Sequence, residues 1–141
     1  MLKMYRPVQK ILLVLLFIYG VASLLHFVHN AEYLADYPNL PDSWTRAGVY
    51  FAWIGMTVVG VIGWVLVARN YHLLGLLLIA IYAVLGLDSL GHYIVAPLSS
   101  HTLAMNSTIF FEVTAATLVL VEVAKQMVRR MLQRGSHKYD T

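Results

Sequence analysis

The chain has 141 residues, of which 60% are hydrophobic and only 12% are charged, and its formal net charge is +3. A soluble domain of this size carries about a quarter charged residues, so this composition is typical of a membrane protein. The chain contains no cysteine, which excludes disulfides, thiolate metal sites and thiol nucleophiles. The length suits one domain over 1–141. Because the basic residues flank apolar segments, the positive charge concerns membrane topology and indicates no nucleic-acid partner.

Four segments are apolar and long enough to cross a bilayer, which takes roughly 20 residues of helix. They are expected at about 11–30, 45–68, 71–95 and 107–127. The first segment could also be a secretory signal peptide, but polar residues such as His26 and Glu32 follow it where a small-residue cleavage site would lie. The predicted fold class is therefore all-α, an integral membrane four-helix bundle.

The ends of the helices carry recognisable signals. Asp42 or Ser43 is expected to cap the second helix, and Asn106 or Ser107 is expected to cap the fourth, because short polar side chains bond the free amides of a first turn. The second and third helices are separated only by residues 69–72. Such a short link predicts that these two helices are antiparallel neighbours.

Lysine and arginine predict the orientation, because cytoplasmic loops carry an excess of them. The side of the membrane that holds both termini would carry Lys3, Arg6, Lys10, Arg69, Lys125, Arg129, Arg130, Arg134 and Lys138. The other side would carry Arg46 alone. We therefore expect a multi-pass protein of the cell inner (plasma) membrane with both termini cytoplasmic and with the two longer loops on the outer side.

Polar residues are concentrated toward the outer side. They comprise four of the six histidines and five of the seven acids, namely His26, His29, His92, His101, Glu32, Asp36, Asp42, Asp88 and Glu112. At 1.5 Å per residue, Asp88 would lie about 12 Å and Glu112 about 8 Å below the outer helix ends. His92 would share a helix face with Asp88, because residues four apart are neighbours.

The first helix is expected to contribute a polar stripe to the same region. Its members recur at helical spacing, at Tyr19, Ser23, His26, Asn30 and Tyr33. No lysine or arginine lies in the outer half of a span, although the side chain of Arg46 could reach one of the buried acids from the interface. The buried acids therefore need a histidine, a proton or a metal ion as partner.

The leading hypothesis is a metal site. Imidazole and carboxylate together suit zinc or non-haem iron, in a redox or hydrolytic component. The first ligands would be His26, Asp88, His92 and Glu112, with His29 and His101 at the mouth of the pocket. A b-type haem between His26 and His92 is a weaker alternative.

The rival hypothesis has no tightly bound cofactor. The same residues would form a hydrogen-bonded polar cluster in a quinone- or lipid-binding protein, or in a non-enzymatic accessory subunit of a membrane complex. Three glycines of the second helix, Gly55, Gly60 and Gly63, favour close helix packing, within the bundle or in a homo-oligomer.

The stretch 20–66 resembles the DoxX-like family of small four-helix membrane proteins. The residues that carry the resemblance are Gly20-Val21-Ala22, Leu25-His26-Phe27, Tyr37-Pro38 and Leu40-Pro41, followed by the glycine-containing second helix. The resemblance implies a four-helix plan and a role beside membrane oxidoreductases or quinone-linked complexes.

Overall fold

The structure is a computed structural model, which describes the backbone of residues 5–136 and the side chains of residues 9–133. The chain forms α1 (Tyr5–Glu32), η1 (Leu34–Asp36), α2 (Arg46–Ala68), α3 (His72–Leu87), η2 (Asp88–Gly91), α4 (His92–Val95), η3 (Leu98–Ser100) and α5 (Leu103–Ser136). Four helical segments of the described chain are long and apolar enough to cross a membrane, at Gln9–Glu32, Arg46–Ala68, His72–Val95 and Leu103–Gln133.

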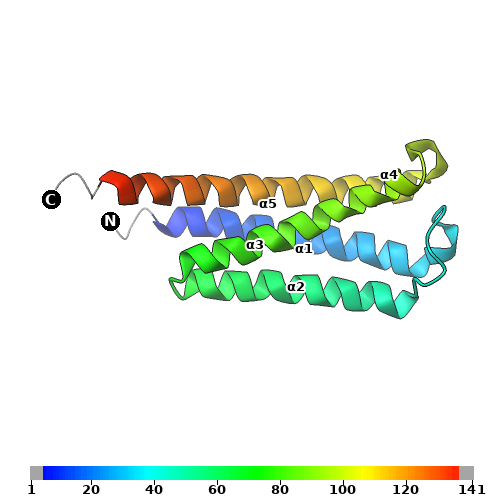
Figure 1. The fold of residues 1–141 in the computed structure, drawn as a ribbon, viewed down its shortest axis with the longest axis horizontal. Coiled ribbons are helices and arrows are strands. Elements are labelled where there is room, and N and C mark those ends of the chain that lie inside the picture. The colour runs from blue at the N-terminus through cyan, green and yellow to red at the C-terminus, as the bar shows by residue number, and fades with distance from the viewer. Residues whose placement is uncertain (1–4, 137–141) are drawn as a thin grey trace.

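The four long helices run side by side (Figure 1). The described chain begins and ends at the end of the bundle that also holds the α2–α3 turn, here called the terminal end. The loops 33–45 and 96–102 lie at the opposite end, here called the loop end. This arrangement confirms the all-helical fold and the antiparallel pairing of the second and third helices.

The turn between α2 and α3 is short because α2 ends in a left-handed cap. Asn70 has a φ of 69°, a conformation that asparagine tolerates better than most residues. The amide of Tyr71 donates to the carbonyl of Leu66 at 2.9 Å, and that of Asn70 donates to Val67 at 3.1 Å. These two bonds satisfy the last carbonyls of the helix in a Schellman motif and send the chain directly back along α2.

The packing of α3 changes along its length. Near the turn its backbone lies against α2, where a Cβ on Gly75 would be 2.7 Å from the carbonyl oxygen of Gly63. Toward the loop end α3 crosses the bundle diagonally and leaves α2 (Figure 1). The absence of side chains at Gly63 and Gly75 permits the close approach at one end, and the separation at the other end leaves room beside α2 for a pocket.

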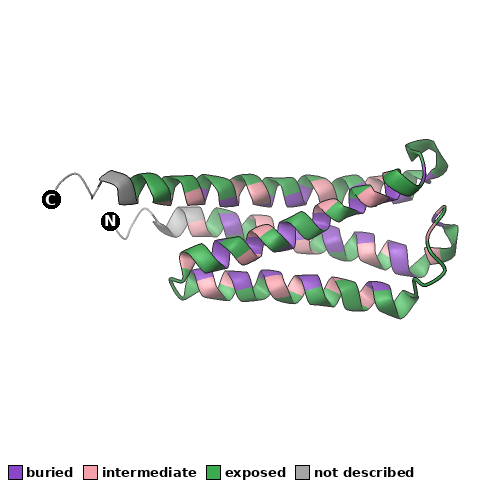
Figure 2. Ribbon diagram, in the orientation of Figure 1, coloured by how far each residue is buried: buried purple, intermediate pink, exposed green. Residues whose placement is uncertain are grey.

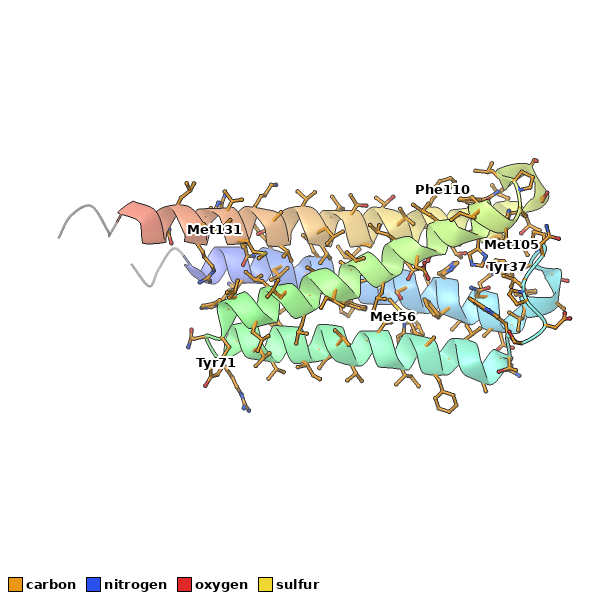
Figure 3. The ribbon with its side chains drawn as sticks, viewed as in Figure 1. Tyr37, Met56, Tyr71, Met105, Phe110 and Met131 are labelled. Atoms are coloured by element: carbon orange, nitrogen blue, oxygen red, sulfur yellow. The ribbon has the colours of Figure 1, made fainter. Side chains whose placement is uncertain are left out.

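Burial follows the inward faces of the helices (Figure 2). The terminal half of the core is apolar, with Leu12, Leu76, Ile79, Val119 and Val123 at most 2% exposed. The loop half of the core contains apolar side chains such as Met105 and Ile109, but it also holds all the buried polar side chains of the described residues except Gln126, namely Ser23, His26, Asn30, Ser89, His92, His101 and Glu112. The outward faces carry large apolar side chains such as those of Phe110 and Met131 (Figure 3).

Three helix starts differ from the sequence prediction, and the first is that of α1, which begins at Tyr5 rather than at about residue 11. The side chain of Thr45, rather than Asp42 or Ser43, accepts the capping bond of α2, from the amide of Gly48 at 3.1 Å. Helix α5 begins at Leu103, earlier than the predicted residue 107, because the hydroxyl of Thr102 accepts a bond from the Met105 amide at 3.2 Å. Threonine is a weaker capping residue than aspartate or asparagine, so the sequence signal favoured its neighbours.

Thr102→Ala is expected to lower the free energy of unfolding by about 1 kcal/mol, because it removes the acceptor for an amide of the first turn of α5. Denaturation of the purified protein in mixed micelles, followed by circular dichroism, measures this. Ser107→Ala is the matched control, since the Ser107 hydroxyl only bonds the Leu103 carbonyl within the helix. An equal loss in both variants would contradict the capping role.

Candidate ligand-binding site

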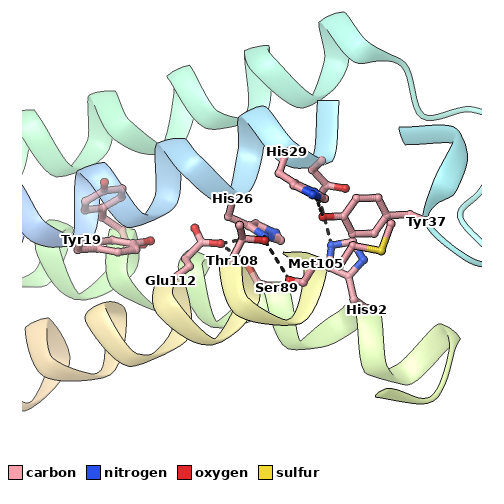
Figure 4. Close-up of polar contacts among 11 residues, drawn as sticks. Tyr19, His26, His29, Tyr37, Ser89, His92, Met105, Thr108 and Glu112 are labelled. Carbon is pink, nitrogen blue, oxygen red and sulfur yellow. Dashed lines mark hydrogen bonds and ion pairs between the residues drawn. The ribbon is translucent and has the colours of Figure 1, made fainter. Parts of the chain in front are cut away.

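The centre of the polar cluster is the side chain of Glu112 on α5, which is fully buried. Nine residues separate it from the start of α5, so it lies about 14 Å below that end, deeper than the predicted 8 Å. Its Oε2 accepts a hydrogen bond from the Ser89 hydroxyl and lies 3.7 Å from Nε2 of His26 (Figure 4). Three different helical segments therefore meet at one carboxyl group.

His26 on α1 has an oxygen atom opposite each of its ring nitrogens. Its Nδ1 lies 3.3 Å from the hydroxyl oxygen of Thr108, and its Nε2 faces the carboxyl of Glu112. The Thr108 hydroxyl donates its own hydrogen to the carbonyl of Met105 at 3.0 Å. Its oxygen is thus left to accept from Nδ1 of His26, which identifies Nδ1 as the protonated nitrogen of a neutral ring.

His92 on α4 has the opposite surroundings. Its Nε2 lies 3.2 Å from the side-chain amide nitrogen of Asn30, which can only donate. Nε2 must then carry the lone pair, and the hydrogen of the neutral ring lies on Nδ1. The rings of His26 and His92 are 5.5 Å apart between centroids, so the two histidines are adjacent. Nδ1 of His26 donates a hydrogen bond to its neighbour, whereas Nε2 of His92 accepts one from its neighbour.

The aromatic side chains of Tyr37, His29 and His101 cover the cluster at the loop end. Tyr37 from the loop after η1 is 4% exposed, and its ring lies 4.9 Å from that of His92 between centroids. Burial raises the pKa of the Tyr37 hydroxyl to about 12, so this group stays neutral near pH 7. Its oxygen lies 3.0 Å from Nδ1 of His29 (Figure 4). His101 lies 6.1 Å from His92 between centroids, and its Nδ1 donates to the carbonyl of Pro97 at 3.1 Å.

A pocket of about 420 Å³ lies in front of this cluster, where α3 separates from α2. The polar part of the lining includes His26, Asn30, Asp88, Ser89 and His92. The apolar part includes Phe27, Trp44, Val49, Ala52 and Leu85. Ala52 on α2 and Leu85 on α3 are exposed, so the pocket opens sideways between these two helices, and the exposed lining residues Ser43, Trp44 and Thr45 open it toward the loop end as well. Its volume falls within the usual range for small-molecule sites, roughly 300–1,000 Å³.

A polar contact joins α1 and α2 beside the pocket. Arg46 donates to Oε1 of Glu32 from Nε at 3.0 Å and from a terminal nitrogen at 2.6 Å, and the Tyr50 hydroxyl donates to the same oxygen at 2.6 Å. Arg46 therefore pairs with Glu32 at the surface and with neither of the acids predicted to be buried. Such exposed pairs contribute little stability.

Asp88 differs most from the sequence prediction. It is exposed at the pocket rim, and Ser89 takes the inward position beside Glu112. The physical reason is that α3 ends at Leu87 and the chain tightens into the 3-10 turn η2 before α4 begins. The expected four-residue spacing of Asp88 and His92 on one face required a continuous α-helix. Glycine weakens a helix, so Gly86 just before this turn and Gly91 at its end were the sequence signal for an interruption.

The other predicted residues come together to different degrees. His26 and Glu112 are in direct contact and His92 adjoins His26, whereas His29 and His101 lie nearer the loop end beside Tyr37, outside the lining of the pocket. Of the predicted α1 stripe, Tyr19, Ser23, His26 and Asn30 are buried, whereas Tyr33 is 53% exposed. Within the described residues, no group of three or more histidine and acidic side chains is arranged to hold a metal ion. Zinc, non-haem iron and haem b stay predictions.

Comparisons with known proteins identify no relative: no family model, no curated protein and no solved structure matches this chain. The resemblance to the DoxX-like family therefore stays a prediction. The fold and the site together define an all-helical bundle of four apolar helices, with a buried carboxyl–imidazole cluster behind a side-opening pocket.

Proposed function

We propose that this chain is a multi-pass protein of the plasma (inner) membrane that binds a small amphiphile with a planar polar head group, of the quinone class, in the pocket between α1, α2 and α3. The protein would act as a binding or accessory component of a membrane redox system. The observation that carries the proposal is the pocket itself, whose lining combines polar and apolar side chains and which opens between two apolar helices as well as toward the loop end.

The orientation of the proposed protein rests on charge. The described basic side chains at the terminal end are Lys10, Arg69, Lys125, Arg129 and Arg130, whereas Arg46 lies at the loop end. Because cytoplasmic segments carry the excess of lysine and arginine, the terminal end would be cytoplasmic and the pocket would lie in the outer half of the membrane. An amphiphile could then enter from the outer leaflet without crossing water.

The polar part of the lining suits a head group with carbonyl oxygens. The Asn30 amide occupies Nε2 of His92, which leaves the hydrogen on Nδ1 of His92 as a donor for a ligand. Asn30 also has a side-chain oxygen without a hydrogen-bond partner among the described residues, which can accept a bond from a hydroxyl group of the reduced, hydroquinone form. The aromatic rings of Phe27 and Trp44 line the same pocket and offer flat apolar surface to a planar ring.

Ala52→Leu is expected to weaken binding of menadione, a tailless naphthoquinone, by about tenfold, because the larger side chain projects into the pocket and overpacking costs about 1–3 kcal/mol. Quinones quench tryptophan fluorescence, so titration of the purified protein in mild detergent reports occupancy through Trp44.

Val58→Leu is the matched control, since Val58 lies on α2 outside the pocket and is 49% exposed. This variant should bind menadione as the unmodified protein does. Unsaturable quenching by the unmodified protein, or equal affinity in all three proteins, would refute the proposed function.

A further inference from the structure

The two histidines in the pocket wall differ in whether their surroundings accept a positive charge. Both nitrogens of His26 face oxygen atoms, those of Thr108 and Glu112, so an imidazolium ring could donate at both positions. Nε2 of His92 faces the amide donor of Asn30, which fits only the neutral ring. The geometry therefore makes His26 the histidine that can carry charge and His92 the neutral hydrogen-bond donor.

Glu112 and His26 hold at least one dissociable proton between them. A charge buried at this depth is costly unless it is paired, and among the described residues only His26 forms an ion pair with Glu112. A neutral pair and a carboxylate–imidazolium pair have the same total charge of zero. Oε1 of Glu112 and the hydroxyl oxygen of Ser23 are both buried and have no hydrogen-bond partner within the described part of the chain, so the carboxyl can accept a further proton on Oε1 beside Ser23.

The other titratable or charged side chains around the pair come from every neighbouring segment. They are Tyr19 and His29 on α1, Tyr37 after η1, Tyr82 on α3, Asp88 on η2, His92 and Tyr93 on α4, and His101 after η3, with the paired Glu32, Arg46 and Tyr50 at the rim. The only lysine or arginine among these described side chains is Arg46, and it is paired with Glu32. Asp88 adds a carboxyl group to the pocket lining.

An anionic head group in this pocket therefore has no permanent counter-ion. We propose that the pocket binds the anionic form of a weakly acidic head group, such as a hydroxyquinone, a phenol or a carboxylic acid, and that the Glu112–His26 pair takes up one proton from solvent as the anion binds. The bound state then holds the imidazolium of His26 beside the ligand anion, with a protonated carboxyl at Glu112. This inference rests on the proposed function, because it names the ligand chemistry of the same pocket.

His26 and Ser89 link Glu112 to the bound ligand, since both side chains line the pocket and both contact Glu112. No bond other than those to the transferred proton is made or broken. The added proton balances the ligand charge, so the occupied pocket has the same total charge as the empty one. Bringing an anion into a low-dielectric site without that proton would cost several kcal/mol.

Isothermal titration calorimetry in buffers of different ionisation enthalpy measures the number of protons taken up per ligand. We expect about one proton for 2-hydroxy-1,4-naphthoquinone, which is anionic at neutral pH, and none for menadione, which has no acidic group. This comparison uses the unmodified protein and needs no variant. Binding of neither ligand would refute the proposed function, whereas binding of the hydroxyquinone without proton uptake would refute only the proton coupling.

Three variants assign the proton to the pair. His26→Gln should abolish the uptake and weaken the anionic ligand at least tenfold while it still binds menadione, and His92→Gln should keep the uptake. Thr108→Val removes the acceptor for Nδ1 of His26 with little change in volume, and should weaken the anionic ligand about tenfold with menadione unaffected. Proton uptake that survives His26→Gln, or that disappears in His92→Gln, would overturn the assignment.

Discussion

His26→Leu is expected to lower the free energy of unfolding by about 3 kcal/mol, because it leaves the carboxyl of Glu112 buried without its imidazole partner. Glu112→Leu should lower the free energy of unfolding by a similar amount, since Nε2 of His26 loses its carboxyl partner and the hydroxyl of Ser89 loses its acceptor. The double variant His26→Leu/Glu112→Leu should recover more than half of the summed loss, because two apolar side chains of similar volume replace the pair.

A double-mutant cycle measures this coupling, with unfolding by sodium dodecyl sulfate in mixed micelles followed by tryptophan fluorescence. Leu25→Ala is a suitable control on α1, since Leu25 is one residue from His26 and is 58% exposed. Losses that simply add in the double variant would show that the two side chains do not act as one unit.

Gly86→Ala should produce the second large effect, a loss of about 1–3 kcal/mol in the free energy of unfolding. A Cβ at this position would lie 2.7 Å from two ring carbons of Tyr19 and closer still to its hydroxyl oxygen. Tyr19 cannot move aside easily, because it is fully buried and its hydroxyl donates to the carbonyl of Tyr82 at 3.0 Å. The added methyl group therefore forces α1 and α3 apart.

The matched control is Gly55→Ala on α2, where a Cβ would meet nothing within 4 Å. Alanine favours the helix over glycine, so this variant should be neutral or up to about 1 kcal/mol more stable. Thermal denaturation followed by circular dichroism compares the two. A loss of stability in Gly55→Ala equal to that in Gly86→Ala would mean that helix propensity or insertion, and not the contact with Tyr19, controls the result.

The ring pair at Gly86 also separates the two halves of the core. Tyr19 and Tyr82 lie 4.4 Å apart between centroids, with the polar cluster on the loop side and the apolar core on the terminal side. Gly60 and Gly86 make room for these rings, because a Cβ on either glycine would clash with Tyr82 or Tyr19. The two glycines thus allow the Tyr19 and Tyr82 rings to pack between the polar cluster and the apolar half of the core.

Several features could be predicted from the sequence because they depend on local composition or periodicity. Four apolar segments are enough to predict four long helices. The spacing of Tyr19, Ser23, His26 and Asn30 predicts that they share one face of α1, and the same rule places Thr108 and Glu112 together on α5. The gathering of histidines toward one end of the bundle follows directly from the order of the spans.

Only the tertiary structure decided which of these polar residues meet. The tightening of the chain at η2 brings Ser89 inward and turns Asp88 to the rim, where α3 and η2 pack against α5. The pocket exists because α3 leaves α2 after their close contact at Gly63 and Gly75. Tyr37 reaches His92 from a loop whose path no periodicity describes. Helix formation is governed by neighbours along the chain, whereas a site built from three helices and a loop is governed by packing between segments distant in sequence.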